Sequence, residues 1–383
     1  MQTTLNARTL LTQDGTVSYP VITLEEGRIT SIEAGQPNAS TETLTATFFD
    51  VHVHGAVGLD FMASTPAEIT QAGRFLATRG VGYYLPTTVT GPVDHTLTAL
   101  DHIATTIEAA SENTPLAPGQ QPAATPVGIH LEGPFVSPVK RGVHPPASIL
   151  SPDVALFDRF QQAARGHISL LTIAPELPNA IDLIRHATAQ GVRVSLGHSN
   201  ATLAEALAGI EAGAVSATHT FNAMRALDHR EPGILGAILD SDKLYAEAIC
   251  DGIHVHPSMV RLWLKMKGAQ RGLLVTDGMS ATGMPDGTYK LGDLVVELAN
   301  GTCLSGGTLA GSVLTMDRAV ANVQAFTGTD LATAVGLASR NPAEMLGLSD
   351  LGRIAPGCPA NFNVYDATHQ LKHTILAGQT VQQ

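Results

Sequence analysis

The sequence predicts an α/β fold, namely a TIM-like (β/α)8 barrel with a small β-sandwich domain formed by both termini. Eight apolar runs of strand length recur through the middle of the chain, and helical patterns separate them. Most of these runs end at or near a His, Asp or Glu, as expected when parallel strands converge on one active site. Both ends of the chain instead contain short strand-like segments joined by tight turns.

The two ends of the chain predict a β domain of their own. Strand-like segments with turn residues between them lie at 21–24, 28–32, 360–366, 371–376 and 380–381. Because both ends share this character and flank an α/β middle, we expect one small β domain built from residues 1–47 and 348–383. The barrel then occupies residues 48–347, and 383 residues are enough for both parts.

The middle of the chain alternates strand and helix patterns. The candidate strands lie at 48–54, 81–87, 126–132, 168–174, 192–198, 214–219, 244–250 and 272–277. Helical periodicity between them is found, for example, at 66–79, 179–190, 202–212 and 257–267. Eight parallel strands joined by crossover helices fit a (β/α)8 barrel. The Gly-rich stretch from 278 to about 309 contains short strand-like pieces and is expected to decorate the barrel after its last strand.

Composition and charge exclude several classes of function. Hydrophobic residues make up 44% of the chain and charged residues 15%, so a large core can form and disorder is not expected. The formal net charge of −12 argues against binding to nucleic acid or an anionic membrane, because both require basic patches. The 3 cysteines are far apart and odd in number, which favours a reducing cytoplasm over a disulfide framework. We also find no signal-peptide pattern and no apolar run of membrane-spanning length, so we expect a cytoplasmic protein.

The ends of the candidate strands predict a metal centre. His52 and His54 are two positions apart on a strand, so their side chains point to the same side and can bind one ion. Glu132, His198 and His219 each end a predicted strand, where barrel active sites form, and are the best candidate ligands. Imidazole and carboxylate groups suit a divalent metal such as Zn²⁺ or Fe²⁺. A lone His at a strand end is more often structural, but the shared placement of these residues favours a metal.

Asp277 ends the last predicted strand and is the candidate catalytic base. A carboxylate beside a metal-activated water can remove a proton from it. The alternative is a turn residue, because Asp-Gly pairs are common in turns. His130 precedes Glu132 by two positions, hence lies on the same face but one layer deeper, and we interpret it as a packed histidine that supports the site.

Several short motifs recur in a specific order along nearly the whole chain. They lie at 52–55 (HVHG), 130–135 (HLEGPF), 140–144 (KRGVH), 197–199 (GHS), 219–224 (HTFNAM), 230–233 (REPG), 251–255 (DGIHV), 276–278 (TDG) and 309–312 (LAGS). With these motifs the chain resembles the amidohydrolase superfamily and, within it, the N-acetylglucosamine-6-phosphate deacetylases. Each motif alone is modest support, whereas their order and spacing together are highly specific.

The resemblance implies roles for the candidate ligands. Glu132, His198 and His219 correspond to the metal site that family members share, while His52 and His54 correspond to ligands of a second metal. Some members have amides in place of this His pair and use one metal, so one or two divalent metals per chain are implied. In a two-metal site Glu132 would be the bridge. No lysine ends a strand here, which disfavours the hydantoinase and dihydroorotase branches that bridge with a carboxylated lysine.

The resemblance also implies a pocket for an amino sugar phosphate. His144 corresponds to the residue that contacts the acetamide carbonyl and stabilises the oxyanion, and His254 to a sugar contact. Leu309 would line the sugar or acetyl pocket, although an ordinary core position is its alternative. Asp277 would lie near the metal of the His pair, take a proton from water and return it to the departing amine.

Binding of the phosphate is implied for a separate set of residues. The Asn222 and Ala223 backbone amides, together with the Asn222 side chain, would form a cradle for the anion. Arg230 corresponds to an arginine that family members donate from a neighbouring subunit, which implies a homodimer. The alternative for Arg230 is a surface ion pair with Glu231.

The activity implied in this way is hydrolysis of the acetamide of N-acetylglucosamine 6-phosphate to glucosamine 6-phosphate and acetate. Three alternatives remain. The substrate is another N-acetyl sugar phosphate such as N-acetylgalactosamine 6-phosphate, since the sugar epimer is not encoded in these motifs. In the second alternative, the chain is an amidohydrolase of another kind, such as an amino-acid deacylase. Or it is a non-catalytic protein that binds a sugar phosphate, which the intact Asp277 and ligand set disfavour.

Overall fold

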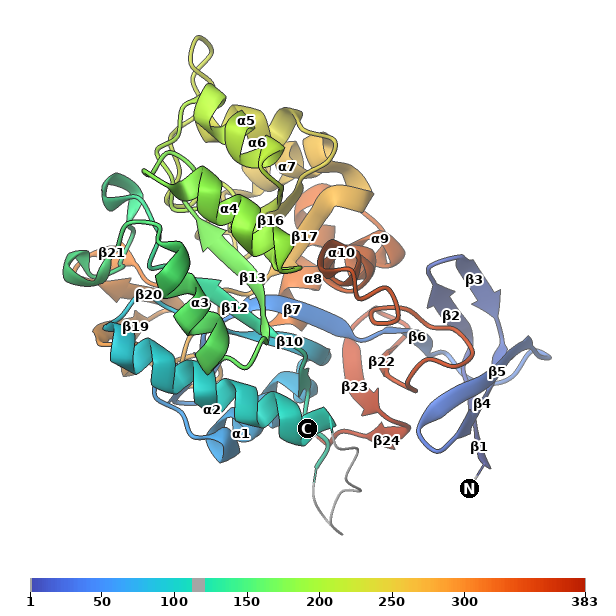
Figure 1. The fold of residues 1–383 in the computed structure, drawn as a ribbon. Coiled ribbons are helices and arrows are strands. Elements are labelled where there is room, and N and C mark those ends of the chain that lie inside the picture. Colours follow the sequence, from blue (N-terminus) through green and yellow to red (C-terminus); the bar gives the residue numbers. More distant parts are fainter. Residues whose placement is uncertain (1, 112–120, 383) are drawn as a thin grey trace.

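The barrel predicted from the sequence is confirmed by the computed structural model, which describes residues 2–111 and 121–382 (Figure 1). Eight parallel strands form its wall: β7 (Phe48–Val53), β10 (Val81–Thr88), β12 (Ile129–Glu132), β13 (Ile168–Ile173), β14 (Arg193–Leu196), β15 (Ala214–Ala217), β16 (Tyr245–Ile249) and β17 (Gly272–Val275). A two-residue strand, β11 (Thr125–Pro126), also pairs with β10. Each wall strand begins and ends within about three residues of its predicted bounds, because buried parallel strands are continuous apolar runs.

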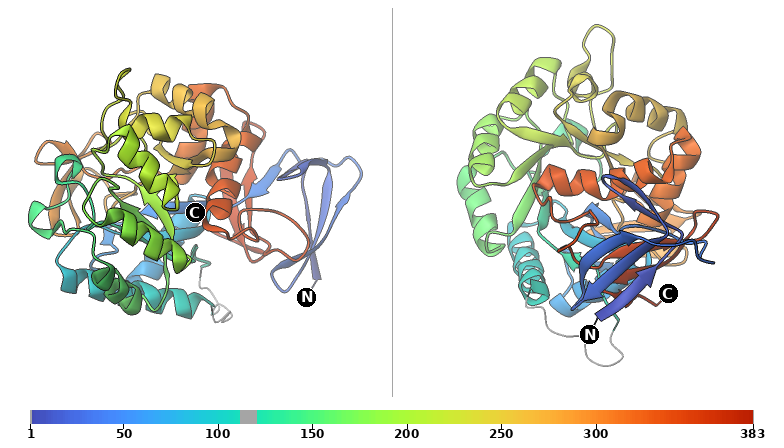
Figure 2. Two further views of the ribbon diagram at one scale, coloured as in Figure 1. Left: turned by 45° about the horizontal axis from the view of Figure 1, so that its top comes forward. Right: turned by 90° about the vertical axis from the view of Figure 1, so that its right-hand side faces the viewer.

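Helices form a ring around this wall, as the right-hand view of Figure 2 shows. They are α1 (Pro66–Thr78), α2 (Val93–Ser111), α3 (Val154–Ala163), α4 (Ala180–Ala189), α5 (Leu203–Glu211), α6 (Gly233–Asp240), α7 (Pro257–Arg271), α8 (Met316–Thr327), α9 (Leu331–Ala338) and α10 (Arg340–Leu346). The sequence encodes their starts locally. In α1, Thr65 and Glu68 cap each other's backbone and Pro66 occupies the first turn, where its missing N–H costs nothing. No helix of the described residues is long and apolar enough to cross a membrane.

The barrel closes where its first and last strands meet at their carboxyl ends. The Asp277 N–H donates to the His52 carbonyl (2.8 Å), and the His54 N–H donates to the Gly278 carbonyl (2.7 Å). The buried Asp50 side chain adds to this seam, because its Oδ2 accepts from the Thr276 hydroxyl (2.5 Å). The seam therefore joins the segment of the His pair to the segment of the candidate base.

Segments from both termini build two further sheets. One has the order β1 (Gln2–Asn6), β4 (Pro20–Glu25), β5 (Arg28–Ala34). The other has the order β24 (Gln379–Thr380), β23 (Leu371–Leu376), β22 (Phe362–Tyr365), β6 (Thr43–Ala46), β2 (Thr9–Thr12), β3 (Gly15–Ser18). Apolar side chains from both sheets, among them Leu10, Ile22 and Phe362, share one core. Strand β6 runs directly into β7, so these sheets lie at the end of the barrel where the strands begin (Figure 1).

Short elements decorate the opposite end of the barrel. A four-stranded antiparallel sheet follows β17, made of β18 (Gly287–Leu291), β19 (Leu294–Ala299), β20 (Thr302–Ser305) and β21 (Thr308–Leu309). The smaller pieces are β8 (Gly55–Ala56), β9 (Leu59–Asp60) and two 3₁₀ helices, Pro138–Lys140 and Pro146–Ser148. Met279, Leu291 and Val296 belong to a separate apolar cluster that anchors the added sheet. The prediction that the 278–309 stretch decorates the barrel is borne out. The added sheet places Leu309 at the end of the barrel where the strands terminate.

Candidate metal centre and active site

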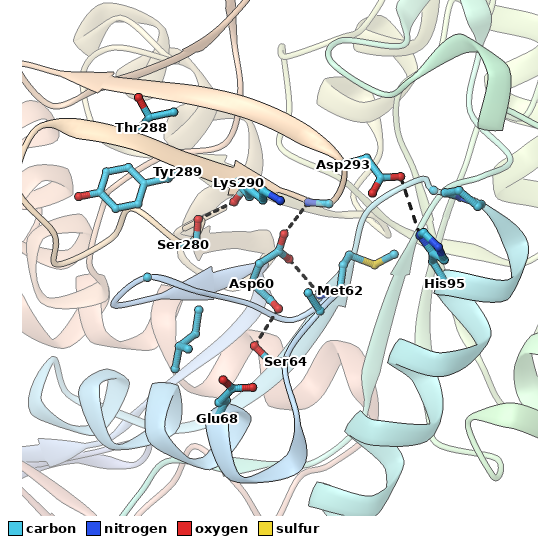
Figure 3. A pocket seen from close by; sticks show the side chains of 16 residues that line it. Asp60, Met62, Ser64, Glu68, His95, Ser280, Thr288, Tyr289, Lys290 and Asp293 are labelled. Carbon is cyan, nitrogen blue, oxygen red and sulfur yellow. Dashed lines mark hydrogen bonds and ion pairs between the residues drawn. The ribbon is translucent and has the colours of Figure 1, made fainter.

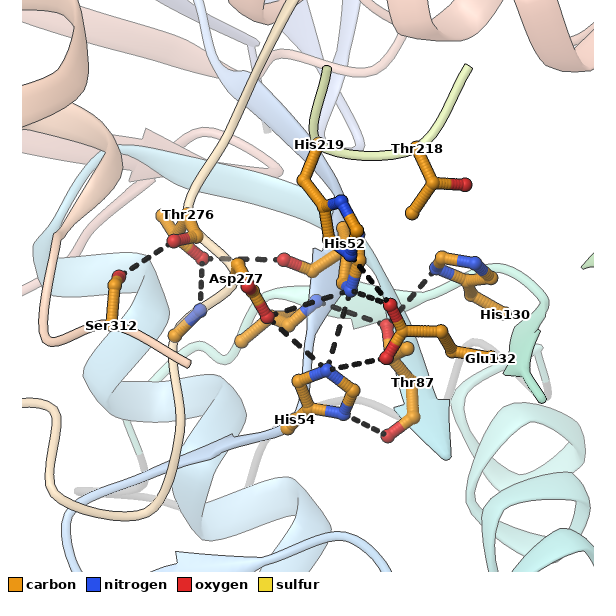
Figure 4. A network of polar contacts seen from close by, with 12 residues as sticks. His52, His54, Thr87, His130, Glu132, Thr218, His219, Thr276, Asp277 and Ser312 are labelled. Carbon is orange, nitrogen blue, oxygen red and sulfur yellow. Dashed lines mark hydrogen bonds and ion pairs between the residues drawn. The ribbon is translucent and has the colours of Figure 1, made fainter. Parts of the chain in front are cut away.

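Two groups of ligand-type side chains lie at the carboxyl ends of the barrel strands. Figure 4 labels all of their members except His198. Within each group the ligand atoms are all within 4.8 Å of one another, and every member is buried. The Glu132 group consists of Glu132, His198 and His219, and the His52 group of His52, His54 and Asp277. The structure thus brings together all residues predicted as ligands or as the base, although they come from five different strands.

Glu132 lies between the two groups. Its Oε1 is 3.1 Å from His219 Nε2 and 3.3 Å from His198 Nε2. Its Oε2 is 3.3 Å from His54 Nε2, and Asp277 Oδ1 is 3.2 Å from that same nitrogen. Oε1 is also 3.4 Å from His52 Nε2, so the carboxylate faces both groups, as a ligand shared between neighbouring ions would.

The backbone directs the ligands into the mouth in two ways. His52 lies on β7 and His54 follows its last residue, so strand alternation alone puts both rings on one side. His198, His219 and Asp277 follow their strands by two residues and have φ angles of 46°, 28° and 50°. Left-handed conformations are uncommon outside glycine and concentrate at functional sites. Here these conformations turn the backbone sharply at each of the three residues, so that its side chain faces the site.

Backbone carbonyls set the tautomers of two of the imidazoles. His54 Nδ1 donates to the Thr87 carbonyl (3.2 Å), and His198 Nδ1 donates to the Lys140 carbonyl (3.0 Å). A carbonyl can only accept, so Nδ1 carries a proton in both rings, which leaves Nε2 as the nitrogen that faces the site. Through this nitrogen each ring can bind a metal.

The pKa shifts show that the buried carboxylates and imidazoles of the site stabilise each other's charged forms. Burial lowers the pKa of His54, but contacts with Asp277 and Glu132 outweigh burial and raise that pKa to about 9. Burial raises the pKa of Asp277, but His52 and His54 outweigh it and lower that pKa to about 2. Buried carboxylates and imidazoles that shift one another's pKa values in this way are well matched to a cation. The donor set therefore fits a divalent metal.

Both groups open into a cavity of about 360 Å³. Its lining includes most of the residues predicted to bind substrate, namely His144, Asn222, Ala223, His254 and Leu309, together with the Glu132 group, His54 and Asp277. Residues that sequence reasoning did not single out, such as Val143, Leu291 and Thr308, line it as well. Arg230 does not line this cavity of its own chain; it is exposed, in the loop before α6.

His144 and His254 each have a polar partner that the sequence did not reveal. His144 Nδ1 is 2.6 Å from Thr90 Oγ1, and His144 Nε2 is 3.3 Å from His198 Nε2. Burial, and to a lesser extent the nearby His198, holds the pKa of His144 well below its ordinary value, so the ring is neutral. His254 Nδ1 is 2.6 Å from Asp251 Oδ2, and this contact outweighs burial and raises the pKa of His254.

The predicted phosphate cradle differs in one detail from expectation. The Asn222 N–H already donates to the His219 carbonyl (3.0 Å), and the Asn222 side chain donates to the same carbonyl (3.2 Å). The Ala223 N–H has no acceptor within the described ranges and belongs to a residue with φ of 50° that lines the cavity. The free backbone donor of this turn is therefore that of Ala223.

Glu247 is the most notable functional candidate that sequence reasoning missed. Its side chain is fully buried on β16, and its Oε2 is 3.0 Å from both His52 Nδ1 and the His219 backbone nitrogen. A charged residue within the apolar run at 244–250 was the available signal, because buried acids are rare. His130 was interpreted as a packed residue, and it is fully buried with its Nε2 2.7 Å from Thr172 Oγ1.

A larger cavity of about 600 Å³ lies beside the site, between the starts of α1 and α2 and the β18–β19 hairpin (Figure 3). Its acidic groups already have partners: Asp60 accepts from the Gly292 N–H (2.5 Å), and Asp293 pairs with His95 (3.9 Å). None of the residues of the two ligand groups lines it. We therefore place the candidate active site in the smaller cavity.

Comparison with known proteins agrees with this fold and site. The model of the amidohydrolase family matches residues 43–381. An N-acetylgalactosamine-6-phosphate deacetylase of Escherichia coli O157:H7 is 36% identical over 98% of each chain. An N-acetylglucosamine-6-phosphate deacetylase of Lysinibacillus sphaericus is 35% identical over 90% of this chain and 87% of its own.

A solved structure also superposes over the full length of both chains. It is a mutant N-acetyl-D-glucosamine-6-phosphate deacetylase from Mycobacterium smegmatis in complex with N-acetyl-D-glucosamine-6-phosphate, with a TM-score of 0.92 and 32% identity. The order of the motifs, the barrel and the match over nearly the whole chain lead to one conclusion: the protein belongs to the amidohydrolase family, in the group of the N-acetyl amino sugar 6-phosphate deacetylases.

Proposed function

We propose that this protein hydrolyses the acetamide of N-acetylglucosamine 6-phosphate to glucosamine 6-phosphate and acetate. The observation that carries the proposal is that Asp277 and His144 line the same cavity as the Glu132 group. An acid–base carboxylate, a neutral imidazole and a set of metal ligands on one cavity are the parts that amide hydrolysis requires. Relatives that carry the name of this activity match most of the chain.

The metal would be divalent, with Zn²⁺ and Fe²⁺ as the chemically suited ions. Glu132, His198 and His219 would hold one ion, and His52 and His54 would hold a second. When bound, such an ion supplies Lewis acidity, which polarises the amide carbonyl and lowers the pKa of water.

Asp277 would move the proton. With a pKa of about 2 its carboxylate is ionised at neutral pH, so it can accept a proton from the attacking water. Its position on the cavity wall then lets it pass this proton to the nitrogen of the departing amine. Both transfers use one group, so the carboxylate is ionised again after each turnover.

His144 would stabilise the oxyanion as a neutral donor. The Thr90 hydroxyl lies 2.6 Å from His144 Nδ1 and can donate to it. With Nδ1 as the acceptor, Nε2 carries the proton and can donate to the acetyl oxygen as negative charge develops there. Loss of one such donor typically costs about 2.7–4 kcal/mol of transition-state stabilisation.

The phosphate would bind at the turn of Asn222 and Ala223. The Ala223 N–H is free to donate to an anion, and backbone amides at such turns suit phosphate. Arg230 would complete this site from a second subunit, because it is exposed and does not line the cavity of its own chain. This part of the proposal requires a homodimer, in which each subunit completes the site of the other.

N-acetylgalactosamine 6-phosphate is the second candidate substrate. It is favoured by a specific observation, since the relative that covers 98% of both chains carries that name. The two sugars differ only at C4, so the same amide chemistry and phosphate site serve both.

Acetate release is the experiment that tests the proposal. The protein with known metal content is given N-acetylglucosamine 6-phosphate, its unphosphorylated form and N-acetylgalactosamine 6-phosphate. We expect fast turnover of the gluco phosphate and slow turnover without the phosphate. A higher kcat/KM for the galacto phosphate would identify N-acetylgalactosamine 6-phosphate as the substrate instead. If none of the three compounds released acetate, the protein would be a non-catalytic one that binds a sugar phosphate.

Mixing two inactive variants tests the shared site. Arg230→Ala should raise KM about 10- to 100-fold, because a hydrogen bond to a charged group contributes about 1.5–3 kcal/mol. Asp277→Asn should lose kcat. After subunit exchange, the mixed dimer has one complete site only if Arg230 acts across the interface, so restored turnover at low substrate supports donation in trans. No restoration would place Arg230 in the site of its own chain or outside the site.

A further inference from the structure

Glu247 stands out among the buried polar groups that the proposed reaction does not use. Its carboxylate is fully buried in the barrel, and Oε1 has no hydrogen-bond partner among the described residues. Burial of a carboxylate with an unsatisfied oxygen lowers the stability of the fold, and packing alone does not compensate for this cost. A residue kept under this cost calls for a functional explanation.

The two contacts of Glu247 Oε2 determine how the His52 ring is protonated. The His219 backbone N–H, at 3.0 Å, can only donate, so Oε2 is an acceptor. His52 Nδ1 lies 3.0 Å from the same oxygen, and two acceptors at this distance would repel each other. Nδ1 therefore carries a proton, and Nε2 is the nitrogen through which the ring can bind a metal.

His52 Nε2 faces the site. Nε2 is 3.3 Å from His54 Nε2, 3.4 Å from Glu132 Oε1 and 3.5 Å from Asp277 Oδ1. The corresponding partners of His54 and His198 are neutral backbone carbonyls. Among these rings His52 alone has a carboxyl group behind it, and a carboxylate in that position makes an imidazole a stronger ligand.

Resting on the proposed function, we propose that Glu247 is the positioning residue for a second metal at His52 and His54. It fixes the tautomer and orientation of His52 through Nδ1, and its charge balances a cation bound on the other side of the ring. The charges of the site agree with this role. Glu132, Asp277 and Glu247 are three buried carboxylates, which two divalent cations offset better than one.

Metal content per chain is the first readout, since it is independent of deacetylase activity. The wild-type protein, saturated with Zn²⁺ and then freed of excess ion, should hold two ions. Glu247→Leu removes the acceptor and should reduce this number to one, with affinity for the second ion lowered about 10- to 100-fold in a chelator competition. Glu247→Gln can keep an oxygen toward His52 Nδ1 without the charge, and should bind the second ion with intermediate affinity.

Thr172→Val is the matched control. It removes a buried hydroxyl from the barrel interior whose hydrogen-bond partners are His130 and Thr218 and, among the described residues, no member of either ligand group. We expect this variant to hold two ions. The thermal unfolding midpoint of each metal-free variant shows whether it is folded, and Glu247→Gln tests the proposal even if Glu247→Leu does not fold.

Four results would overturn the role of Glu247. These are an unchanged second affinity in Glu247→Leu, loss of both ions in that variant, equal loss in Thr172→Val, and a wild-type protein that binds one ion. Failure of the deacetylase proposal is a separate outcome, because it would appear as two bound ions without acetate release.

Discussion

The two ligand groups are held by different parts of the barrel. The ring of His52 is fully buried, comes from a regular strand and is anchored by Glu247. His198 and His219 lie beyond their strands on left-handed turns, and both line the cavity. His219 Nδ1 even lacks a hydrogen-bond partner within the described residues. The barrel wall thus holds the ring of His52, whereas His198, His219 and also Asp277 depend on turns beyond their strands and line the cavity.

This difference suggests that metals bound at the two groups would have different roles. A metal at the Glu132 group would be open to substrate, because each of its three ligands lines the cavity. A metal at the His52 group would lie deeper and would tune the charge felt by Glu132 and Asp277. Substitutions that affect one group, both groups or neither should separate these roles.

The largest effect is expected where the two groups meet. Glu132→Gln removes the charge of the carboxylate that faces both groups, and its amide nitrogen cannot bind a metal. We expect acetate release to fall below detection and the metal content to fall by at least one ion per chain, as measured by mass spectrometry on desalted protein. Retention of full metal content would show that Glu132 is not shared.

Loss of the carboxylate of Asp277 should greatly reduce turnover, while the Glu132 group keeps its ion. Asp277→Asn preserves size but cannot accept a proton, so kcat should fall about 10²- to 10⁴-fold. Pre-steady-state and steady-state acetate release measure the effect. A variant with wild-type kcat would exclude Asp277 as the proton carrier.

Removal of the His pair should have a smaller effect on the chemistry. With His52→Asn and His54→Asn combined, we expect one ion per chain and a reduced but measurable kcat, because the Glu132 group stays intact. Metal content and acetate release on the same sample provide the comparison. If all activity disappears while one ion remains bound, the ion at the His52 group takes part in the reaction itself.

The smallest effect is expected at Thr90. Thr90→Val removes the hydroxyl that orients His144 and should lower kcat about 10-fold, since partners of this kind contribute about 1 kcal/mol or more. Metal content should be unchanged, because Thr90 contacts neither group. A parallel loss of metal would mean that His144 also supports His198, whose Nε2 is 3.3 Å away.

The fold was predictable because the relevant physics is local. Buried parallel strands are apolar runs, so the pattern at 272–277 identified β17 (Gly272–Val275). Helix starts are encoded just as locally, although the predicted ranges rested on periodicity alone: Thr202 and Glu205 form a capping box directly before and within α5. The shared character of the two chain ends indicated one β domain, but the strand at 43–46 and its pairing with β22 were not predicted.

The site was predictable only as far as residue type and strand position allow. Ligands at strand ends could be found in this way, but partners that meet through the fold could not. Glu247 and His52 are 195 positions apart, and Thr90 and His144 are 54 apart. The left-handed turns at His198 and His219 were also unpredictable, because nothing in a histidine side chain favours φ above zero.

An ion at the His52 group would have a mechanical role at the seam between β7 and β17. Thr276 and Asp50, which meet there, are 226 positions apart along the chain. An ion held by His54 and Asp277 would cross-link the first and last strands of the barrel. Its effect would be comparable to that of a disulfide that closes a loop of this length. Chelation should therefore loosen the seam before the rest of the wall, and the site can form only after the whole barrel has been assembled.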